Sequence, residues 1–334
     1  MTKSEKIFAD AARLAAIDAP APRSANRAYR ERFGEWEARA GVRNWKSDGG
    51  VDAGKLPFSP ELVPLTRHAL VRDRGETAIY HLLAQHLYMF CNFTEHVELE
   101  AIVPASVLLR FGDAPFGVPE ALARDAGRVV IDEAWHAQCA GDLRAEIQSA
   151  VGVAPCRMRK PAFLHVLHVV KATLPERERR LADLVFACVS ETLITSSLNH
   201  VPRDDKVITK VREVLGEHAR EEGYHHAIFG QAMGVMWEQL SAEDRDFAGP
   251  LFGIFIAAFL RPDTLAEMDA LESAGFSASE AKGIVEETHD EPSLRAELWR
   301  AAAPTVRFMR GHGLLDHATT QDMLADLALT TPTA

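Results

Sequence analysis

Two short patterns of glutamate and histidine stand out in the sequence because together they could bind metal ions. Glu133 and His136 are three residues apart, and His218, Glu222 and His225 follow a His-x-x-x-Glu-x-x-His spacing. At about 100° per residue, the three side chains of the second pattern share one narrow stripe of a helix. Two imidazoles and a carboxylate on one buried stripe are costly unless a cation neutralises them. The spacing therefore predicts a metal site.

A lone glutamate in an apolar segment strengthens this prediction. Glu191 interrupts the otherwise uncharged run LVFACVSETLITSSL and continues the face marked by Leu184 and Cys188. Charged side chains are almost never buried without a partner, so this carboxylate is expected to meet a cation in the core. A fourth segment, FTEHVELE, offers Glu98 or Glu95, and helical periodicity does not separate these two.

The order Glu, Glu-x-x-His, Glu, Glu-x-x-His is what a four-helix bundle needs to hold two metal ions. One Glu comes from each of two helices, and a Glu-x-x-His comes from each of the other two. Carboxylates and neutral imidazoles suit ferrous iron while leaving positions open for oxygen, and manganese is also suited to these ligands. The residues therefore predict a dinuclear iron site in an all-α protein.

Four long helical segments are expected to position these residues. Prolines at 119, 175 and 202 stand where helices begin, a position that tolerates proline, and Pro104 is expected to kink or end the first segment. The segments span about residues 74–110, 119–150, 175–200 and 203–240.

Helical segments are also expected on both sides of this core. Strand and hairpin signals are scarce, and no short-period repeat is present, so the chain is predicted to be one all-α domain, 1–334. Its bundle core is placed at about 74–240, with a linking helix at 162–173. The N-terminal extension is 1–57, with one or two helices, a strongly charged stretch at 26–40 and a loop at 44–57. The C-terminal extension is 241–330, with about four helices broken near Pro262, Gly275 and Pro292.

Composition excludes several classes of protein. The 334 residues are 47% hydrophobic, yet no run approaches the ~20 apolar residues of a membrane span. A net charge of −11 argues against a nucleic-acid partner, which would call for a basic face. Four scattered cysteines do not form a disulfide framework, and the N-terminus lacks the apolar core of a signal peptide. We therefore expect a cytoplasmic protein with no membrane partner.

The four blocks FTEHVELE, DEAWHAQ, CVSETLITSSLNHVPRDD and HAREEGYHHAIF resemble the p-aminobenzoate N-oxygenase family. The resemblance covers about residues 75–310, and its most specific feature is His218, an additional ligand that simpler di-iron carboxylate proteins lack. It implies a ferritin-like four-helix-bundle core, a buried substrate cavity beside the metals, and a homodimer. It also favours Glu98 over Glu95 and implies seven ligands: Glu98, Glu133, His136, Glu191, His218, Glu222 and His225.

The resemblance further implies the reaction. The expected activity uses two iron ions and dioxygen to oxidise an amine, most simply an arylamine, through hydroxylamine and nitroso stages to a nitro group. Such chemistry belongs to secondary metabolism, including antibiotic biosynthesis, and it requires an external electron donor. Some relatives act on an amine tethered to a carrier protein. A carboxylated substrate would want an arginine, for which Arg295, Arg300 and Arg307 are candidates.

Several alternatives remain open from the sequence. A C–H oxygenase would share the ligands, and a ferritin-type iron-oxidising protein would share their order but is usually shorter. A ribonucleotide reductase subunit needs a tyrosine close to the metals, and Tyr224 is turned about 100° from His225. A third Glu-x-x-His, formed by Glu286 and His289 in the charged stretch EETHDEP, is interpreted as accidental. A last alternative is a non-enzymatic helical interaction module in which all of these motifs arise by chance.

Overall fold

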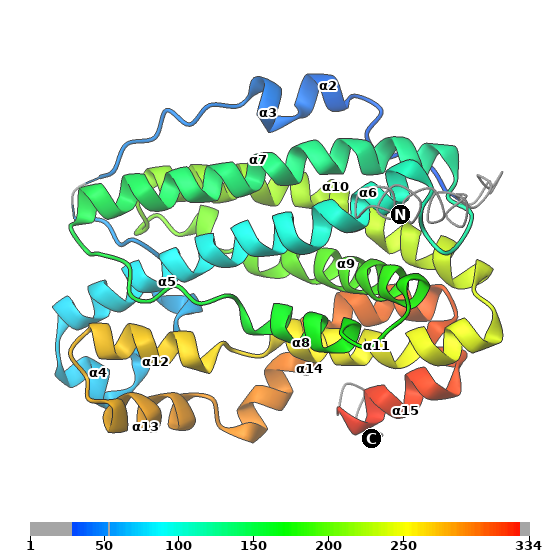
Figure 1. Cartoon of the computed structure of the whole chain (residues 1–334). Helices are drawn as coiled ribbons and strands as arrows, with labels where there is room; N and C mark the ends of the chain where they lie inside the picture. Colours follow the sequence, from blue (N-terminus) through cyan, green and yellow to red (C-terminus); the bar gives the residue numbers. More distant parts are fainter. Residues whose placement is uncertain (1–28, 53, 328–334) are drawn as a thin grey trace, which may run out of the picture.

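The computed structural model describes residues 29–52 and 54–327, and this part of the chain contains helices and no β-strand (Figure 1). Four long helices pack as a bundle, with α9 against α10, α5 against α7, and α7 against α10. The predicted all-α class is therefore confirmed. The four helices are α5 (Glu76–Val97), α7 (Glu120–Val151), α9 (Glu176–Leu198) and α10 (Thr209–Gln239).

The central helix of the bundle is α9. Apart from half-buried Asp183, all residues from 181 to 190 are buried, and the helix contacts α8 (Ala162–Lys171), α10, α11 and α14. A helix that is apolar on all sides belongs in a protein interior, which explains why Glu191 lies in the core. Pro119 and Pro175 occupy the positions just before α7 and α9, as the sequence predicts.

The first bundle helix differs from the prediction at Pro104. It does not end at the proline, but passes through a π-helical turn, η3 (Glu98–Ile102), into α6 (Val103–Phe111). Pro104 lies in the first turn of α6, where its missing N–H group costs little. The helix ends at Gly112, whose φ of 78° suits a glycine C-cap. Single π-helical turns are frequent at functional sites, and this one begins at Glu98.

The fourth bundle helix begins later than predicted. Residues Val201–Arg203 form a 3-10 turn, η4, around Pro202, and α10 starts only at Thr209. Between them, a single parallel β-bridge joins Val207 to Leu56 of the N-terminal loop. This bridge ties the start of α10 to the chain that precedes the bundle.

A segment near the N-terminus crosses the outside of α7 (Figure 1). Two short helices lie within it, α2 (Trp36–Arg39) and α3 (Gly41–Asn44), in agreement with the one or two helices expected near the N-terminus. We refer to residues 36–49 as the strap. Short turns then lead to the bundle: η1 (Pro60–Leu62), η2 (Pro64–Arg67) and α4 (Ala69–Asp73).

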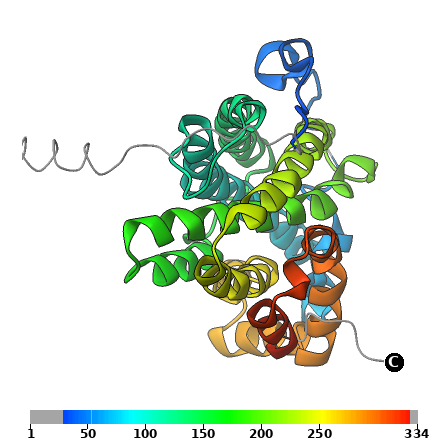
Figure 2. The same ribbon diagram turned by 90° about the vertical axis from the view of Figure 1, so that its right-hand side faces the viewer.

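Five helices, rather than about four, follow the bundle on the side opposite the strap (Figure 2). The breaks predicted near Pro262, Gly275 and Pro292 are confirmed, and a further break occurs at Gly313, where φ is 75°. The helices are α11 (Ala242–Leu260), α12 (Thr264–Ser273), α13 (Ala278–Thr288), α14 (Glu291–Gly311) and α15 (Ala318–Asp326), with the 3-10 turn η5 (Leu314–Asp316) before α15.

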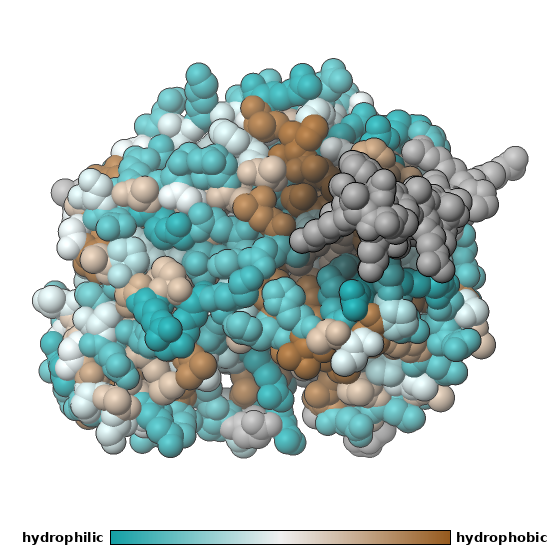
Figure 3. All heavy atoms as spheres, viewed as in Figure 1, coloured by the Kyte–Doolittle hydropathy of each residue, from teal (hydrophilic) through white to brown (hydrophobic). Residues whose placement is uncertain are grey.

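The surface carries a strip of hydrophobic side chains on the face formed by α6 and α7 (Figure 3). Exposed apolar residues on these elements and on η3 include Leu99, Phe111 and Ile131. Contiguous apolar patches of this kind are typical of interaction surfaces. Among the described residues, no helix is both long enough and apolar enough to cross a membrane.

Candidate metal centre

All seven predicted ligands meet in the middle of the bundle. Each of their side chains is buried, and the most accessible, His218, is 8% exposed. They come from η3 and from three bundle helices: Glu98 (η3), Glu133 and His136 (α7), Glu191 (α9), and His218, Glu222 and His225 (α10).

The donor atoms of these residues form three overlapping groups, and within each group they lie within 4.8 Å of one another. The groups are Glu98, His136, His218 and Glu222; Glu133, His136, Glu222 and His225; and Glu98, Glu133 and Glu191. Every two groups share at least one residue, so the donors form one continuous cluster with room for more than one cation. Four carboxylates and three imidazoles suit iron or manganese.

Several polar atoms of the cluster have no hydrogen-bond partner among the described residues. They include both carboxylate oxygens of Glu98 and Glu191 and one oxygen of Glu222, whereas one oxygen of Glu133 lies 2.7 Å from Nδ1 of His225 as an ion pair. Buried polar groups almost always have a partner, so a concentration of unpaired acceptors calls for an explanation. Bound cations would supply it, and the residues present therefore fit a dinuclear metal site.

The electrostatics of the cluster lead to the same conclusion. Burial raises the pKa of Glu98 and of Glu191 well above its ordinary value, and neighbouring carboxylates raise it further. Burial alone would lower the pKa of His136 and of His225, but adjoining carboxylates, Glu133 foremost, raise it well above the ordinary value. Protons thus neutralise the cluster when no cation does, and metal binding would displace them.

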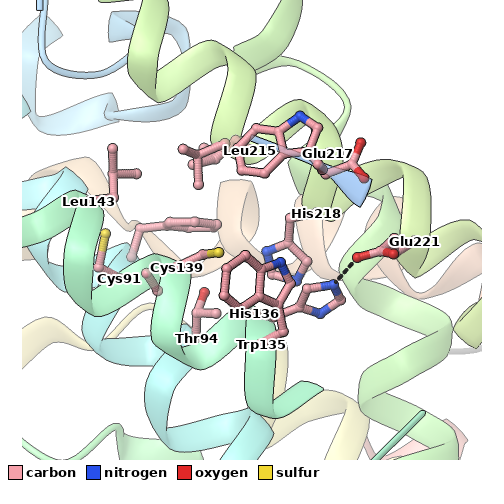
Figure 4. Close-up of a pocket in the computed structure, with 14 residues that line it drawn as sticks. Cys91, Thr94, Trp135, His136, Cys139, Leu143, Leu215, Glu217, His218 and Glu221 are labelled. Carbon is pink, nitrogen blue, oxygen red and sulfur yellow. Dashed lines mark hydrogen bonds and ion pairs between the residues drawn. The ribbon is translucent and has the colours of Figure 1, made fainter. Parts of the chain in front are cut away.

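Two further carboxylates hold the outer nitrogens of the histidines. Glu221 Oε2 lies 3.0 Å from Nε2 of His136 (Figure 4), and Asp132 Oδ2 lies 3.4 Å from Nε2 of His225. Each contact crosses between α7 and α10, because Asp132 and His136 belong to α7 while Glu221 and His225 belong to α10. Such partners fix the tautomer and orientation of ligating histidines.

Sequence reasoning singled out neither Asp132 nor Glu221 as part of the site. A signal was present, because each stands immediately before a predicted ligand, Glu133 or Glu222, in an acid-Glu-x-x-His pattern. In the structure, Asp132 is 1% exposed and Glu221 is 3% exposed. Burial to this extent distinguishes them from ordinary surface carboxylates.

The strap completes this outer layer. The indole N–H of Trp36 donates to both oxygens of Asp132, at 2.8 and 2.9 Å, and the backbone N–H of Gly41 donates to Oε1 of Glu221, at 2.7 Å. A Cβ atom at Gly41 would lie only 3.1 Å from the carboxylates of Glu217 and Glu221, so this close approach favours glycine. The strap therefore holds both carboxylates that support the histidines.

The structure separates the two candidates in FTEHVELE. Glu98 is fully buried in the cluster, whereas half-buried Glu95 pairs with Arg144 on α7. Glu100 lies outside the cluster and pairs with Lys160 and His96.

Other residues singled out from the sequence lie away from the cluster. His289, from the third Glu-x-x-His, contacts Glu267 at 2.8 Å rather than a cluster residue. The hydroxyl of Tyr224 accepts a hydrogen bond from Arg39 of the strap on the exposed side of α10. Neither residue belongs to the groups of possible ligands among the described residues.

A cavity of about 370 Å³ adjoins the cluster, and both Glu98 and His218 lie in its wall. Most of its lining is apolar, including Met89, Phe93 and Phe163. Its described lining does not include the predicted arginines. The arginines that line the cavity are Arg157 and Arg261, which are exposed, and Arg159, which pairs with Asp269. The three candidates from the sequence, Arg295, Arg300 and Arg307, all lie outside this described lining.

The sequence profile described as p-aminobenzoate N-oxygenase AurF matches residues 13–313. The chain belongs to this family. A relative from Streptomyces thioluteus, named 4-aminobenzoate N-oxygenase, is 24% identical over 257 residues, which cover 73% of this chain and 75% of the relative. The resemblance drawn from four sequence blocks is confirmed, and membership in the AurF family supports an oxygenase at the level of the family.

Proposed function

We propose that this member of the AurF family is a non-haem di-iron N-oxygenase that oxidises an arylamine with dioxygen. The observation that carries the proposal is a buried cluster of four carboxylates and three histidines in the wall of a largely apolar cavity. Membership in the p-aminobenzoate N-oxygenase family supports the reaction class. We further propose that the four long helices form a ferritin-like core, within a single domain spanning the chain.

In this proposal, the seven cluster residues hold two iron ions, and manganese would be held by the same donors. When bound, the two metals would activate dioxygen and pass electrons to it. The protein contributes the remaining functions. Asp132 and Glu221 orient the histidines, and the strap keeps these two carboxylates in place.

The cavity would bind the amine and exclude water from it. Phenylalanine and methionine side chains suit an aromatic ring, and the position of Glu98 and His218 in the wall would bring the amino group to the cluster. The cavity volume of about 370 Å³ exceeds the needs of a single ring, so a larger arylamine would fit. An amine tethered to a carrier protein is the alternative, and a C–H substrate in the same cavity is another.

The stoichiometry explains why an electron donor is required. Oxidation of an amine to a hydroxylamine inserts one oxygen atom and leaves the other to be reduced to water, which consumes an electron pair and two protons. The substrate does not supply these electrons, so we propose an external donor. Repetition of oxygenation would lead through a nitroso compound to a nitro group, a transformation that fits secondary metabolism such as antibiotic biosynthesis.

The test is a single reaction of the purified, iron-loaded and chemically reduced protein. It would be mixed with dioxygen and a panel of arylamines that includes p-aminobenzoate, and the products would be identified by mass spectrometry. We expect hydroxylamine, nitroso or nitro products that require both iron and dioxygen. His218→Ala is expected to lose them. Consumption of dioxygen and ferrous iron with a growing iron mineral and no organic product would instead indicate a ferritin-type protein.

The homodimer, which the family resemblance implies, and the cytoplasmic location, which the composition suggests, stay predictions. Sedimentation equilibrium of the full chain would test the homodimer, with twice the mass of a 334-residue chain as the expected result.

A further inference from the structure

A second, much smaller hollow lies against the metal centre. Its volume is about 20 Å³, and it is bounded by α5, α7, α10 and Trp45 of the strap (Figure 4). Among the described residues it shares Phe90, Thr94 and His218 with the large cavity, so these three form the wall between the two spaces. The protein thus has two separate spaces that reach the cluster.

The lining of this hollow is mostly apolar or sulfur-containing. Cys91, Cys139 and Leu143 contribute to it, and the larger aromatic walls are Trp45, Phe90 and Trp135. Burial raises the pKa of Cys91 to about 12 and that of Cys139 to about 11, so both thiols are neutral. Neutral thiols behave as small hydrophobic groups.

The carboxylates that border the hollow are already paired. Glu221 accepts a hydrogen bond from the backbone N–H of Gly41 and contacts His136, and Glu217 pairs with Arg220. A buried water needs two to four polar partners, and apolar cavities stay dry and bind gases such as xenon. The other polar groups of the lining belong to Thr94, the two tryptophans and the two histidines, and the apolar and sulfur-containing side chains outnumber them. We take this lining to favour a small apolar occupant over water.

The size and position of the hollow narrow the choice of occupant. About 10–15 Å³ holds one water, so a volume of about 20 Å³ admits a diatomic molecule but no amine. The rings of His136 and His218, whose centroids are 4.1 Å apart, both border the space. An occupant would thus lie against the part of the cluster that contains these two histidines and Glu98.

We propose that this hollow is a binding site for dioxygen, separate from the cavity that binds the amine. The inference rests on the proposed function, because an N-oxygenase must hold dioxygen and an amine beside the cluster at the same time. An amine in the large cavity would cover the cluster from one side, and the hollow gives the gas a second approach. Phe90 and Thr94 keep the two occupants apart.

Xenon tests the site without iron or turnover. Crystals of the full chain under xenon pressure are expected to hold a xenon atom bordered by Cys139, Leu143 and Leu215. Ala140→Val would fill part of the hollow and is expected to abolish this peak. The same substitution in the large cavity, Ala258→Val, is the matched control and is expected to retain it. An ordered water in the hollow of the wild type, with no xenon, would overturn the proposal.

The functional arm measures how fast dioxygen oxidises ferrous iron in the loaded protein, by stopped-flow absorbance. Ala140→Val is expected to slow this step several-fold. Leu143→Ala, which enlarges the hollow, is expected to raise xenon occupancy and keeps the test valid if the first variant does not fold. An unchanged rate in a variant that has lost xenon would refute the proposal. If xenon binds as expected but no amine is oxidised, the proposed function fails and the gas-binding site stands.

Discussion

Replacing Glu191 with leucine should stabilise the metal-free protein and weaken its response to metal. Glu191 is fully buried in an apolar helix, and neither carboxylate oxygen has a hydrogen-bond partner among the described residues. A buried polar group without a partner costs about 1–3 kcal/mol. At roughly 2 °C per kcal/mol for a chain of this length, Glu191→Leu should raise the metal-free Tm by about 2–6 °C.

The increase in the metal-free Tm caused by Glu191→Leu should depend on pH. Burial, followed by the nearby carboxylates, raises the pKa of Glu191 well above 4.5, so the folded state holds a proton that the unfolded state releases. The wild type is therefore relatively most stable below pH 4.5 and loses this stability as the pH rises toward the folded pKa. The advantage of Glu191→Leu should accordingly grow from acidic to neutral pH.

Metal should reverse the order of stability. Manganous ion at about 100 times its dissociation constant should stabilise the wild type by about 2.7 kcal/mol for each site, and Glu191→Leu by less. Calorimetry with and without the ion measures both effects. Glu95→Leu is the control, because Glu95 pairs with Arg144 outside the cluster and its loss should preserve the response to metal. A metal-free Glu191→Leu protein that melts below the wild type would refute the reasoning, and an equal response to metal would remove Glu191 from the ligands.

Three further predictions follow from contacts in and around the bundle. Trp36→Phe removes the indole N–H that donates to Asp132, and it should weaken manganese binding in a calorimetric titration by less than the roughly 10–100-fold that loss of a direct partner of a ligating histidine costs. The control is Trp237→Phe, which is about equally buried but lies far along α10 and should leave the manganese affinity unchanged. Equal losses of affinity in the two variants would contradict the role of the strap. His218→Ala should reduce the iron content of the purified protein measured by mass spectrometry, and full metal content with full activity would exclude His218 as a ligand. A hydrogen bond to Glu267 raises the pKa of His289 above 6.5, so the stabilisation from this pair is fully present below pH 6.5 and is lost as the pH rises through the folded pKa. His289→Gln should therefore lower the Tm at acidic pH and have the same Tm as the wild type at alkaline pH. A difference in Tm that does not change with pH would refute this.

The helices and most of the cluster could be predicted because their signals are local. The side chains of His218, Glu222 and His225 share a stripe whatever the rest of the chain does, and Glu191 stands out against its apolar neighbours. Family membership, confirmed by comparison, favoured Glu98. Periodicity alone could not do so, because it assumes a regular helix and the π-helical turn at Glu98 breaks that assumption.

The outer layer of the site could not be predicted because its signals are distant in sequence. Asp132 and Glu221 resemble ordinary helix carboxylates until Trp36 and Gly41 of the strap are placed on them, 96 and 180 residues away. The late start of α10 has a similar cause, since its preceding residues pair with Leu56. The cavity arginines also depend on how the loop after α7 folds against the C-terminal helices.

The crossed contacts between α7 and α10 give the site a rigid half and an adaptable half. Asp132 reaches His225 in one direction and Glu221 reaches His136 in the other, so neither helix can slide by a turn of about 5.4 Å without breaking both. The spacing of these histidines is thereby fixed mechanically. Any change in the size or charge of bound ions must be absorbed by side chains free to rotate, and the carboxylates of Glu98 and Glu191, whose oxygens lack hydrogen-bond partners among the described residues, have that freedom.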